Sequence, residues 1–220
     1  IFAGVRDNFI YLTNAYKGDS ISKVSAKSPI ILSNTKDNNL YYLENDGRGN
    51  YELKMLESLE NQTVSNPRIV KTLKGPRGAA EICVAVKNGN EIILGGKNGN
   101  IYKIDADPSI TSSNITQITD NTYSKIYDIC ASNSDFYFLT KNAIFKSSYD
   151  TGVVDKLAST NNQTNILQVS DDEVVLYSAY TKNPVVLKNL KSGEEKQLFI
   201  PKNNVQSINL CYFNGAKVLV

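Results

Sequence analysis

The chain has 220 residues, of which 41% are hydrophobic and 21% are charged, and its formal net charge is +2. This length is enough to bury a core within one domain, and no apolar run approaches the roughly 18 residues that cross a bilayer as a helix. The small net charge argues against nucleic acid as a partner. Histidine does not occur, which excludes Ser-His-Asp and Cys-His nucleophile pairs and histidine-based zinc sites.

One short pattern recurs along the chain. A polar residue is followed by three or four apolar residues, and a turn then leads to a second strand-like run. The six apolar runs end at positions 31, 51, 45, 38 and 43 residues apart, with a mean of about 42. A strand-rich repeat of about 40 to 50 residues is the sequence signature of a β-propeller blade. The runs end at Leu12, Leu43, Leu94, Leu139, Tyr177 and Val220, and we expect Leu12, Leu43, Leu94 and Leu139 to be buried at equivalent positions.

Taken in chain order, the units predict up to four strands each. The first unit begins with a strand near 2–5 and is too short for a fourth strand, and the last stops directly after its second strand. The three most complete units predict strands at 82–86, 91–94, 101–104 and 115–119, then at 126–131, 136–139, 143–146 and 153–157, then at 166–169, 174–177, 185–188 and 197–200. Each run is rich in β-branched and aromatic residues and is bounded by Asn, Gly, Asp or Ser.

The third strand of each unit gives an independent check on this alignment. A lysine lies 11, 11, 9, 7 and 11 residues beyond the second-strand anchor in the five units. These lysines are Lys23, Lys54, Lys103, Lys146 and Lys188. Such agreement predicts that all five occupy the third strand of a blade.

The fold class predicted from these patterns is all-β: a propeller of four-stranded antiparallel blades, with about five and a half blades present. We expect a single domain over 1–220, which is a fragment or is completed by missing segments. The predicted blades are 1–27, 28–75, 80–120, 124–160, 164–201 and a partial blade at 205–220.

The segments 100–105 and 115–120 read NIYKID and ITQITD and resemble the third and fourth strands of TolB-like and YWTD-like propellers. The resemblance is loose, spreads over most of the chain and concerns architecture. It implies a disc of radial sheets that is usually non-catalytic and binds partners through one face. Tryptophan–aspartate (WD40-like) repeat proteins are a neighbouring class, but their Gly-His and Trp-Asp signatures cannot occur in a chain without His or Trp.

Three cysteines, Cys83, Cys130 and Cys211, fall at similar places in three units. We expect them to be buried small hydrophobes on inner strands, because free cysteine is among the most buried residue types. A disulfide between blades is not expected.

Several local motifs have an ordinary structural interpretation beside a functional one. Asp105-Ala106-Asp107-Pro108 offers two oxygen ligands for calcium, but Asp-Pro is a common turn and further ligands are lacking. Asp171-Asp172-Glu173 offers carboxylates of the kind that glycosidases use, yet it precedes a strand as solvated turn charge does. Gly75-Pro76-Arg77-Gly78 has no following helix and is interpreted as a connector. We therefore expect no metal site, no cofactor and no catalytic residues.

Charge is distributed unevenly if the loops are sorted by blade position. In propellers, turns between second and third strands share one face with the connectors between blades. Sorting this chain in that way gives ten cations against four carboxylates on this face, and an acidic excess on the other. The alternative is that the sorting is fortuitous. The residues predicted to contact a partner are Tyr16, Lys17, Arg48, Arg77, Lys97, Tyr180 and Lys182.

The function predicted from the sequence is a non-catalytic scaffold for protein–protein interaction within a larger protein or assembly. Its basic face would steer an acidic segment of a protein partner. The alternative is an extracytoplasmic sugar-binding or sugar-cleaving propeller, in which carboxylates would do the chemistry.

Overall fold

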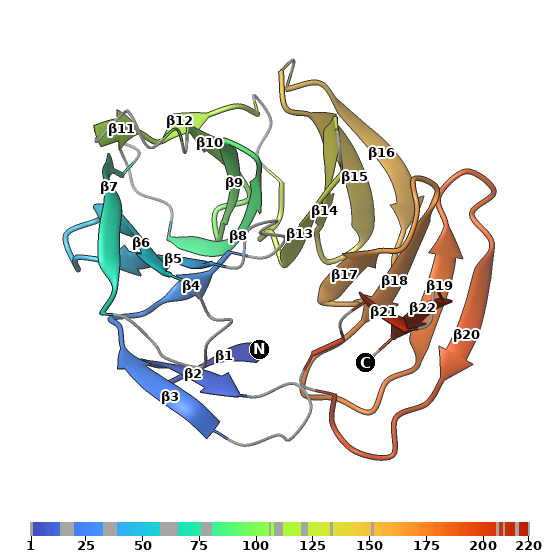
Figure 1. The fold of residues 1–220 in the computed structure, drawn as a ribbon. Coiled ribbons are helices and arrows are strands. Elements are labelled where there is room, and N and C mark those ends of the chain that lie inside the picture. The colour runs from blue at the N-terminus through green and yellow to red at the C-terminus, as the bar shows by residue number, and fades with distance from the viewer. Residues whose placement is uncertain are drawn as a thin grey trace.

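The computed structural model of the chain describes residues 2–13, 20–32, 39–57, 66–75, 81–105, 107, 112–119, 123–132, 134–150, 152–205, 207–208, 210–213 and 216–219. All the regular elements in these ranges are β-strands, which confirms the predicted all-β class. The sheets are arranged around a common centre as the blades of a propeller (Figure 1). The described part of the chain contains no helix that could span a membrane.

The strands form six sheets. The first contains β1 (Phe2–Arg6), β2 (Phe9–Thr13) and β3 (Ser20–Ser25). The second contains β4 (Ile30–Ile31), β5 (Leu40–Asn45), β6 (Tyr51–Leu56), β7 (Arg68–Lys74) and β11 (Ser112–Asn114). The third contains β8 (Ile82–Asn88), β9 (Glu91–Gly96), β10 (Ile101–Asp105) and β12 (Thr116–Gln117).

The remaining sheets come from the C-terminal half of the chain. The fourth contains β13 (Asp128–Ala131), β14 (Asp135–Leu139), β15 (Ala143–Ser148) and β16 (Val154–Ser159). The fifth contains β17 (Asn165–Gln168), β18 (Glu173–Tyr177), β19 (Val185–Asn189) and β20 (Glu195–Phe199), and the sixth pairs β21 (Leu210–Phe213) with β22 (Ala216–Leu219). Strands β4, β8, β13 and β17 lie toward the centre, and β7, β16 and β20 lie toward the outside (Figure 1).

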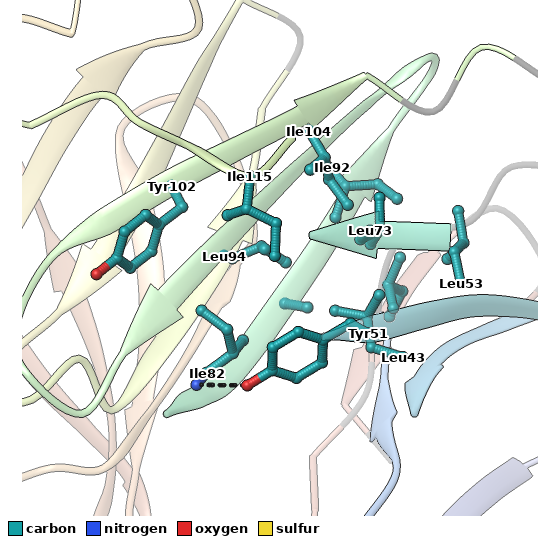
Figure 2. Close-up of a cluster of buried hydrophobic side chains, with 12 residues drawn as sticks. Leu43, Tyr51, Leu53, Leu73, Ile82, Ile92, Leu94, Tyr102, Ile104 and Ile115 are labelled. Carbon is teal, nitrogen blue, oxygen red and sulfur yellow. Dashed lines mark hydrogen bonds between the residues drawn. The ribbon is translucent and has the colours of Figure 1, made fainter. Parts of the chain in front are cut away.

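The core lies between neighbouring sheets and is built on the second strands. The predicted anchors Leu12, Leu43, Leu94 and Leu139 are all fully buried, as expected. Leu43 and Leu94 belong to one cluster, which joins the second and third sheets (Figure 2). Successive side chains of a strand point to opposite faces of its sheet, so those on one face are buried against the adjacent blade. Repeated blades share a core in this way.

The five repeated lysines occupy third strands, as predicted: β3, β6, β10, β15 and β19. Most of them form ion pairs with carboxylates of neighbouring strands. Lys54 Nζ lies 2.9 Å from Glu44 Oε2, and Lys146 Nζ lies 3.0 Å from Asp135 Oδ2. Lys23 instead lies 3.8 Å from the ring centre of Phe9. The repeat therefore positions a cation against the second strand in several blades.

The outer strand of the third unit differs from the prediction. A single strand was expected at 115–119, but the segment divides into β11, which pairs parallel with β7, and β12, which pairs antiparallel with β10. The Ile115 amide donates to the Lys74 carbonyl at 3.2 Å, and the Ile118 amide donates to the Ile101 carbonyl at 3.0 Å. The segment therefore bonds to the outer strands of two sheets in succession.

The cysteines were expected to be buried, and of the two described ones Cys130 is and Cys83 is only partly so. Cys130 is buried on β13, Cys83 is half-buried on β8, and both are free thiols. The side chain of Cys211 lies outside the described residues. Burial raises the pKa of the Cys83 thiol, so this group is a protonated thiol near pH 7 and a poor nucleophile.

Candidate functional site

The loops of the propeller gather at two ends. In the second to fifth sheets, the turn between the second and third strands lies beside the connector that leaves the sheet. The Thr160 amide donates to the Asn142 carbonyl at 2.9 Å, and the Val205 amide donates to the Thr181 carbonyl at 3.1 Å. We call this end the connector end. At the opposite end the remaining turns meet, as where the Leu190 amide donates to the Asp172 carbonyl at 2.7 Å.

In the first sheet, each strand runs in the opposite direction to the corresponding strand of the second to fifth sheets. It has three strands in the described residues, and only residues 26–29 separate the end of β3 from the start of β4. The end of β3 and the start of β4 must therefore lie at the same end of the disc. The Ser28 amide donates to Asn8 Oδ1 at 3.4 Å, and Lys27 Nζ donates to the Asp46 carbonyl at 3.3 Å. The turn after β1 thus lies at the connector end.

This reversal changes one expectation from the loop sorting. Arg6 and Asp7 were assigned to the opposite face, as in an ordinary blade, but the reversed sheet places them near the connector end. They carry opposite charges, and Arg6 Nε lies 3.9 Å from Asp7 Oδ2. Because these two charges cancel, the pair adds no net charge to the connector end.

A cavity of about 290 Å³ lies where the first three sheets meet. Its wall combines apolar side chains with two carboxylates, an amide, two hydroxyl groups and a thiol. The lining residues are Val5, Asp7, Ser28, Pro29, Ile30, Asn45, Tyr51, Glu81, Ile82 and Cys83. The cavity therefore offers both hydrogen-bonding groups and apolar surface to a small molecule.

Hydrogen bonds fix the wall of this cavity. The Ile82 amide donates to the Tyr51 hydroxyl oxygen at 3.2 Å (Figure 2). Asn45 Oδ1 accepts the Gly47 amide at 2.7 Å, and Cys83 Sγ donates to the Ile126 carbonyl at 3.2 Å. Burial raises the pKa of Tyr51, so its hydroxyl is neutral near pH 7. The cavity therefore has a preformed polar wall on the side of the second and third sheets.

The cations around the cavity differ in how far they are neutralised. Lys97 Nζ lies 2.5 Å from Glu81 Oε1, and this hydrogen bond raises the pKa of Lys97. Arg48 is exposed in the turn after β5, where its amide donates to Asp46 Oδ1 at 2.6 Å. Sequence reasoning missed the Glu81 pairing, because Glu81 precedes its strand at a position with no counterpart in the other units.

Two other predicted contact residues, Tyr180 and Lys182, are exposed in the turn after β18. They lie in the fifth sheet, whereas Arg48 and Lys97 lie in the second and third. Tyr16, Lys17 and Arg77 fall outside the described residues. The structure therefore places the four described residues at one end of the disc in two separate groups.

The acidic motifs lie at the opposite end. The Asp107 amide donates to Asp105 Oδ1 at 2.8 Å, which is a local turn stabilised by its own aspartate. Asp172 pairs with Lys191 at 2.8 Å in the turn after β17, and Asp171 is exposed beside it. The described residues contain no group of three or more side chains that could hold a metal ion.

Comparison with solved structures gives the class of the fold. The chain is similar to the crystal structure of TolB from Acinetobacter baumannii, with a TM-score of 0.57 and 12% identity over 96% of this chain and 56% of that one. It is also similar to a candidate 6-phosphogluconolactonase from Bacteroides uniformis, with a TM-score of 0.58 and 13% identity over 96% of this chain and 69% of that one. The protein is therefore a β-propeller, and the predicted likeness to TolB-like propellers is confirmed for the fold.

The comparisons go no further than architecture. The chain spans just over half of the length of TolB. No protein-family profile matches the chain, and no curated protein matches it. A fold of this kind hosts many functions, so the function must be argued from the surface.

Proposed function

We propose that this β-propeller is a non-catalytic scaffold that binds an acidic segment of a protein partner through its connector end. The observation that carries the proposal is the exposure of the cations assigned to that end. All those in the described residues are exposed: Arg6, Lys27, Arg48, Lys74, Lys97, Lys125, Lys141, Lys182 and Lys202.

Few carboxylates compensate this charge. Glu44 pairs with Lys54, Glu81 pairs with Lys97, and Asp7 lies 3.9 Å from Arg6. Asp46 lies in the same turn as Arg48. Exposed charges of one sign raise the association rate of an oppositely charged partner, and salt weakens this effect. An acidic segment would therefore be steered to this end of the disc and away from the acidic opposite end.

The test reverses charge at one end only. A variant with Arg48, Arg77 and Lys97 changed to glutamate is compared with one in which Lys156, Lys191 and Lys196 are changed to glutamate. Both triple variants alter the net charge equally. Binding of a fluorescent 12-residue glutamate peptide at low salt should be clearly weakened in the first and largely retained in the second, with little change in either melting temperature. Undiminished binding by the first variant would refute the proposal.

Sugar binding is the second candidate function, and the cavity favours it. Asp7, Glu81, Ser28 and Tyr51 bring carboxylate and hydroxyl groups into one small cavity, which suits the hydrogen bonding of a sugar ring. A glycan array and a panel of chromogenic glycosides test this function. Turnover that is lost in Glu81→Gln or in Asp171→Asn and Asp172→Asn would overturn the non-catalytic proposal.

A further inference from the structure

Large apolar side chains are exposed at the connector end of the fifth sheet. Tyr180 is 71% exposed, Ile200 is 60% exposed and Phe199 is 42% exposed. Tyr180 lies in the turn after β18, and Phe199 and Ile200 end β20 and begin the following connector. Phe199 pairs with Val185, the first residue of β19, so the segments lie at the same end of one sheet.

The Tyr180 side chain is presented by a rigid turn. Tyr180 has a φ of 61°, a left-handed conformation that is uncommon for a bulky residue and often marks a functional position. Its amide donates to the Val205 carbonyl, and the Val205 amide donates to the Thr181 carbonyl at 3.1 Å. Thr181 Oγ1 also donates to the Ser178 carbonyl at 2.9 Å. A partner would therefore meet an aromatic side chain whose backbone is already ordered.

The neighbouring side chains show that this exposure is not a failure of packing. Leu198 and Val205 pack against a buried cluster that includes Tyr177 and Val185. Phe199 is not part of this cluster and is exposed beside it. The connector end of the sheet thus combines a filled interior with an apolar outer surface, as a preformed binding surface does.

Two cations flank these apolar groups. Lys182 and Lys202 are exposed in the same two segments, and residues 178–184 and 199–205 contain no carboxylate. The positive charge of Lys182 and Lys202 is therefore not paired within these two segments, whereas that of Lys97 is paired with Glu81. We define the fifth-sheet patch as Tyr180, Lys182, Phe199, Ile200 and Lys202.

We propose that the fifth-sheet patch is the docking surface for the partner, and that it binds a segment in which acidic residues alternate with large apolar ones. Carboxylates of such a segment would meet Lys182 and Lys202, and its apolar side chains would cover Tyr180, Phe199 and Ile200. Charge complementarity selects this occupant. Tyrosine side chains in a fixed position and apolar side chains that become buried on binding often contribute most of the binding energy at interfaces. This inference rests on the proposed function and localises it.

The experiment uses the full chain and two labelled peptides measured by fluorescence anisotropy. One peptide repeats Glu-Phe-Asp-Leu three times, and the other replaces every Phe and Leu with Ser. The wild-type chain should bind the apolar peptide at least about tenfold more tightly, because its Phe and Leu side chains would be removed from water on binding. Ile200→Ser and Tyr180→Ser should each weaken its binding by at least about tenfold.

Matched controls separate this surface from the rest of the molecule. Ile69→Ser removes a side chain that is 52% exposed on β7 and should leave binding unchanged. The double variant Lys182→Glu with Lys202→Glu should weaken the binding of both peptides. The double variant Lys156→Glu with Lys196→Glu should leave their binding unchanged. Equal binding of both peptides, no binding of either, or no effect of Ile200→Ser would overturn the inference.

Two outcomes distinguish a failure of this inference from a failure of the proposed function. If only the Arg48, Arg77 and Lys97 variant loses binding, the scaffold function stands and the localisation is wrong. If no charge reversal at the connector end matters, both fail. Tighter binding to vesicles of phosphatidylserine and phosphatidylcholine than to either peptide would assign the patch to a membrane surface and overturn the peptide proposal.

Discussion

Asp128 Oδ2 accepts the backbone amide of Ile166 at 3.0 Å. Asp128 begins β13 and Ile166 lies on β17, so the contact joins the inner strands of two neighbouring blades. The other carboxylate oxygen accepts the amide of Ile129 at 2.9 Å. One side chain therefore accepts hydrogen bonds from backbone amides on both strands. These two strands belong to different sheets and are not paired with each other, so the side chain provides a link between them.

The Asp128 contact should make stability depend on pH in an unusual direction. Burial raises the pKa of Asp128 from 3.8 to about 6. Because the folded-state pKa exceeds the unfolded one, the folded state binds a proton more tightly, and the contribution of Asp128 to the free energy of unfolding grows as the pH falls from about 7 to about 4. Urea unfolding of the wild type and Asp128→Ala measures this contribution, since other carboxylates are common to both. A wild-type advantage that shrinks on acidification would contradict the expectation.

Removal of one second-strand anchor should be strongly destabilising. Leu94→Ala is expected to lower the free energy of unfolding by about 2 to 5 kcal/mol, because the side chain is fully buried between two sheets and its loss leaves a cavity. Ile69→Ala, at a half-exposed site on β7, is the matched control and should cost less than about 1 kcal/mol. Denaturant unfolding followed by circular dichroism measures both. Similar costs at the two sites would show that the sheet interface is not filled.

Two glycines with left-handed backbone conformations should respond differently to alanine. Gly99 has a φ of 85°, and an added Cβ would lie 1.7 Å from the Tyr123 carbonyl oxygen. Gly89 has a φ of 57°, and an added Cβ would meet nothing within 4 Å. Both variants suffer backbone strain of about 1 kcal/mol, but only Gly99→Ala must also displace a backbone segment. Its melting temperature should therefore fall further than that of Gly89→Ala, and equal shifts would argue against this close approach.

Lys54 should be the most important of the repeated lysines. It lies 2.9 Å from Glu44 and 3.1 Å from Glu52 and is only 18% exposed. Burial lowers the pKa of Lys54, but hydrogen bonds to the two carboxylates outweigh this and raise it. Lys54→Ala leaves two partly buried carboxylates side by side and should cost about 1 to 3 kcal/mol.

The control for this prediction removes the uncompensated charge. Adding Glu44→Gln and Glu52→Gln to Lys54→Ala should recover part of the lost stability. Lys23→Ala should cost less, since Lys23 is exposed and lies over the rings of Phe9 and Tyr11, with no ion pair in the described part of the chain. Thermal unfolding of the four proteins gives the comparison, and a triple variant no more stable than Lys54→Ala would argue against charge as the cause.

Much of the architecture could be predicted because each blade carries its own signal. A buried second strand and a lysine on the third are local patterns, and Leu94 and Lys103 fell where their spacing placed them. The division of residues 112–117 between two sheets could not be predicted in this way. It depends on hydrogen bonds to Lys74, which lies in another unit.

The candidate site was harder to predict, because it also depends on contacts between different units. Tyr180 and Lys182 are conspicuous in a loop, and their exposure followed from the sequence. The cavity, however, draws Asp7, Asn45 and Glu81 from three units. Their meeting follows from the first sheet, which has three strands in the described residues and runs opposite to the others. This effect on chain direction becomes visible only when the turns are placed in space.

The parallel pairing of β11 with β7 affects how the molecule can open. In a stack of independent repeats each unit could fray without its neighbour, but here the second sheet cannot lose its outer strand without breaking bonds to the third unit. Unfolding of these two blades should therefore be concerted, with amides on β7 exchanging hydrogen at the same rate as those on β10. The same pairing covers Thr72–Lys74 of the β7 edge and leaves the three-residue β11 as the outer strand there. A short edge strand is a poor template for intermolecular strand addition, so one crossing segment contributes both cooperativity and resistance to aggregation.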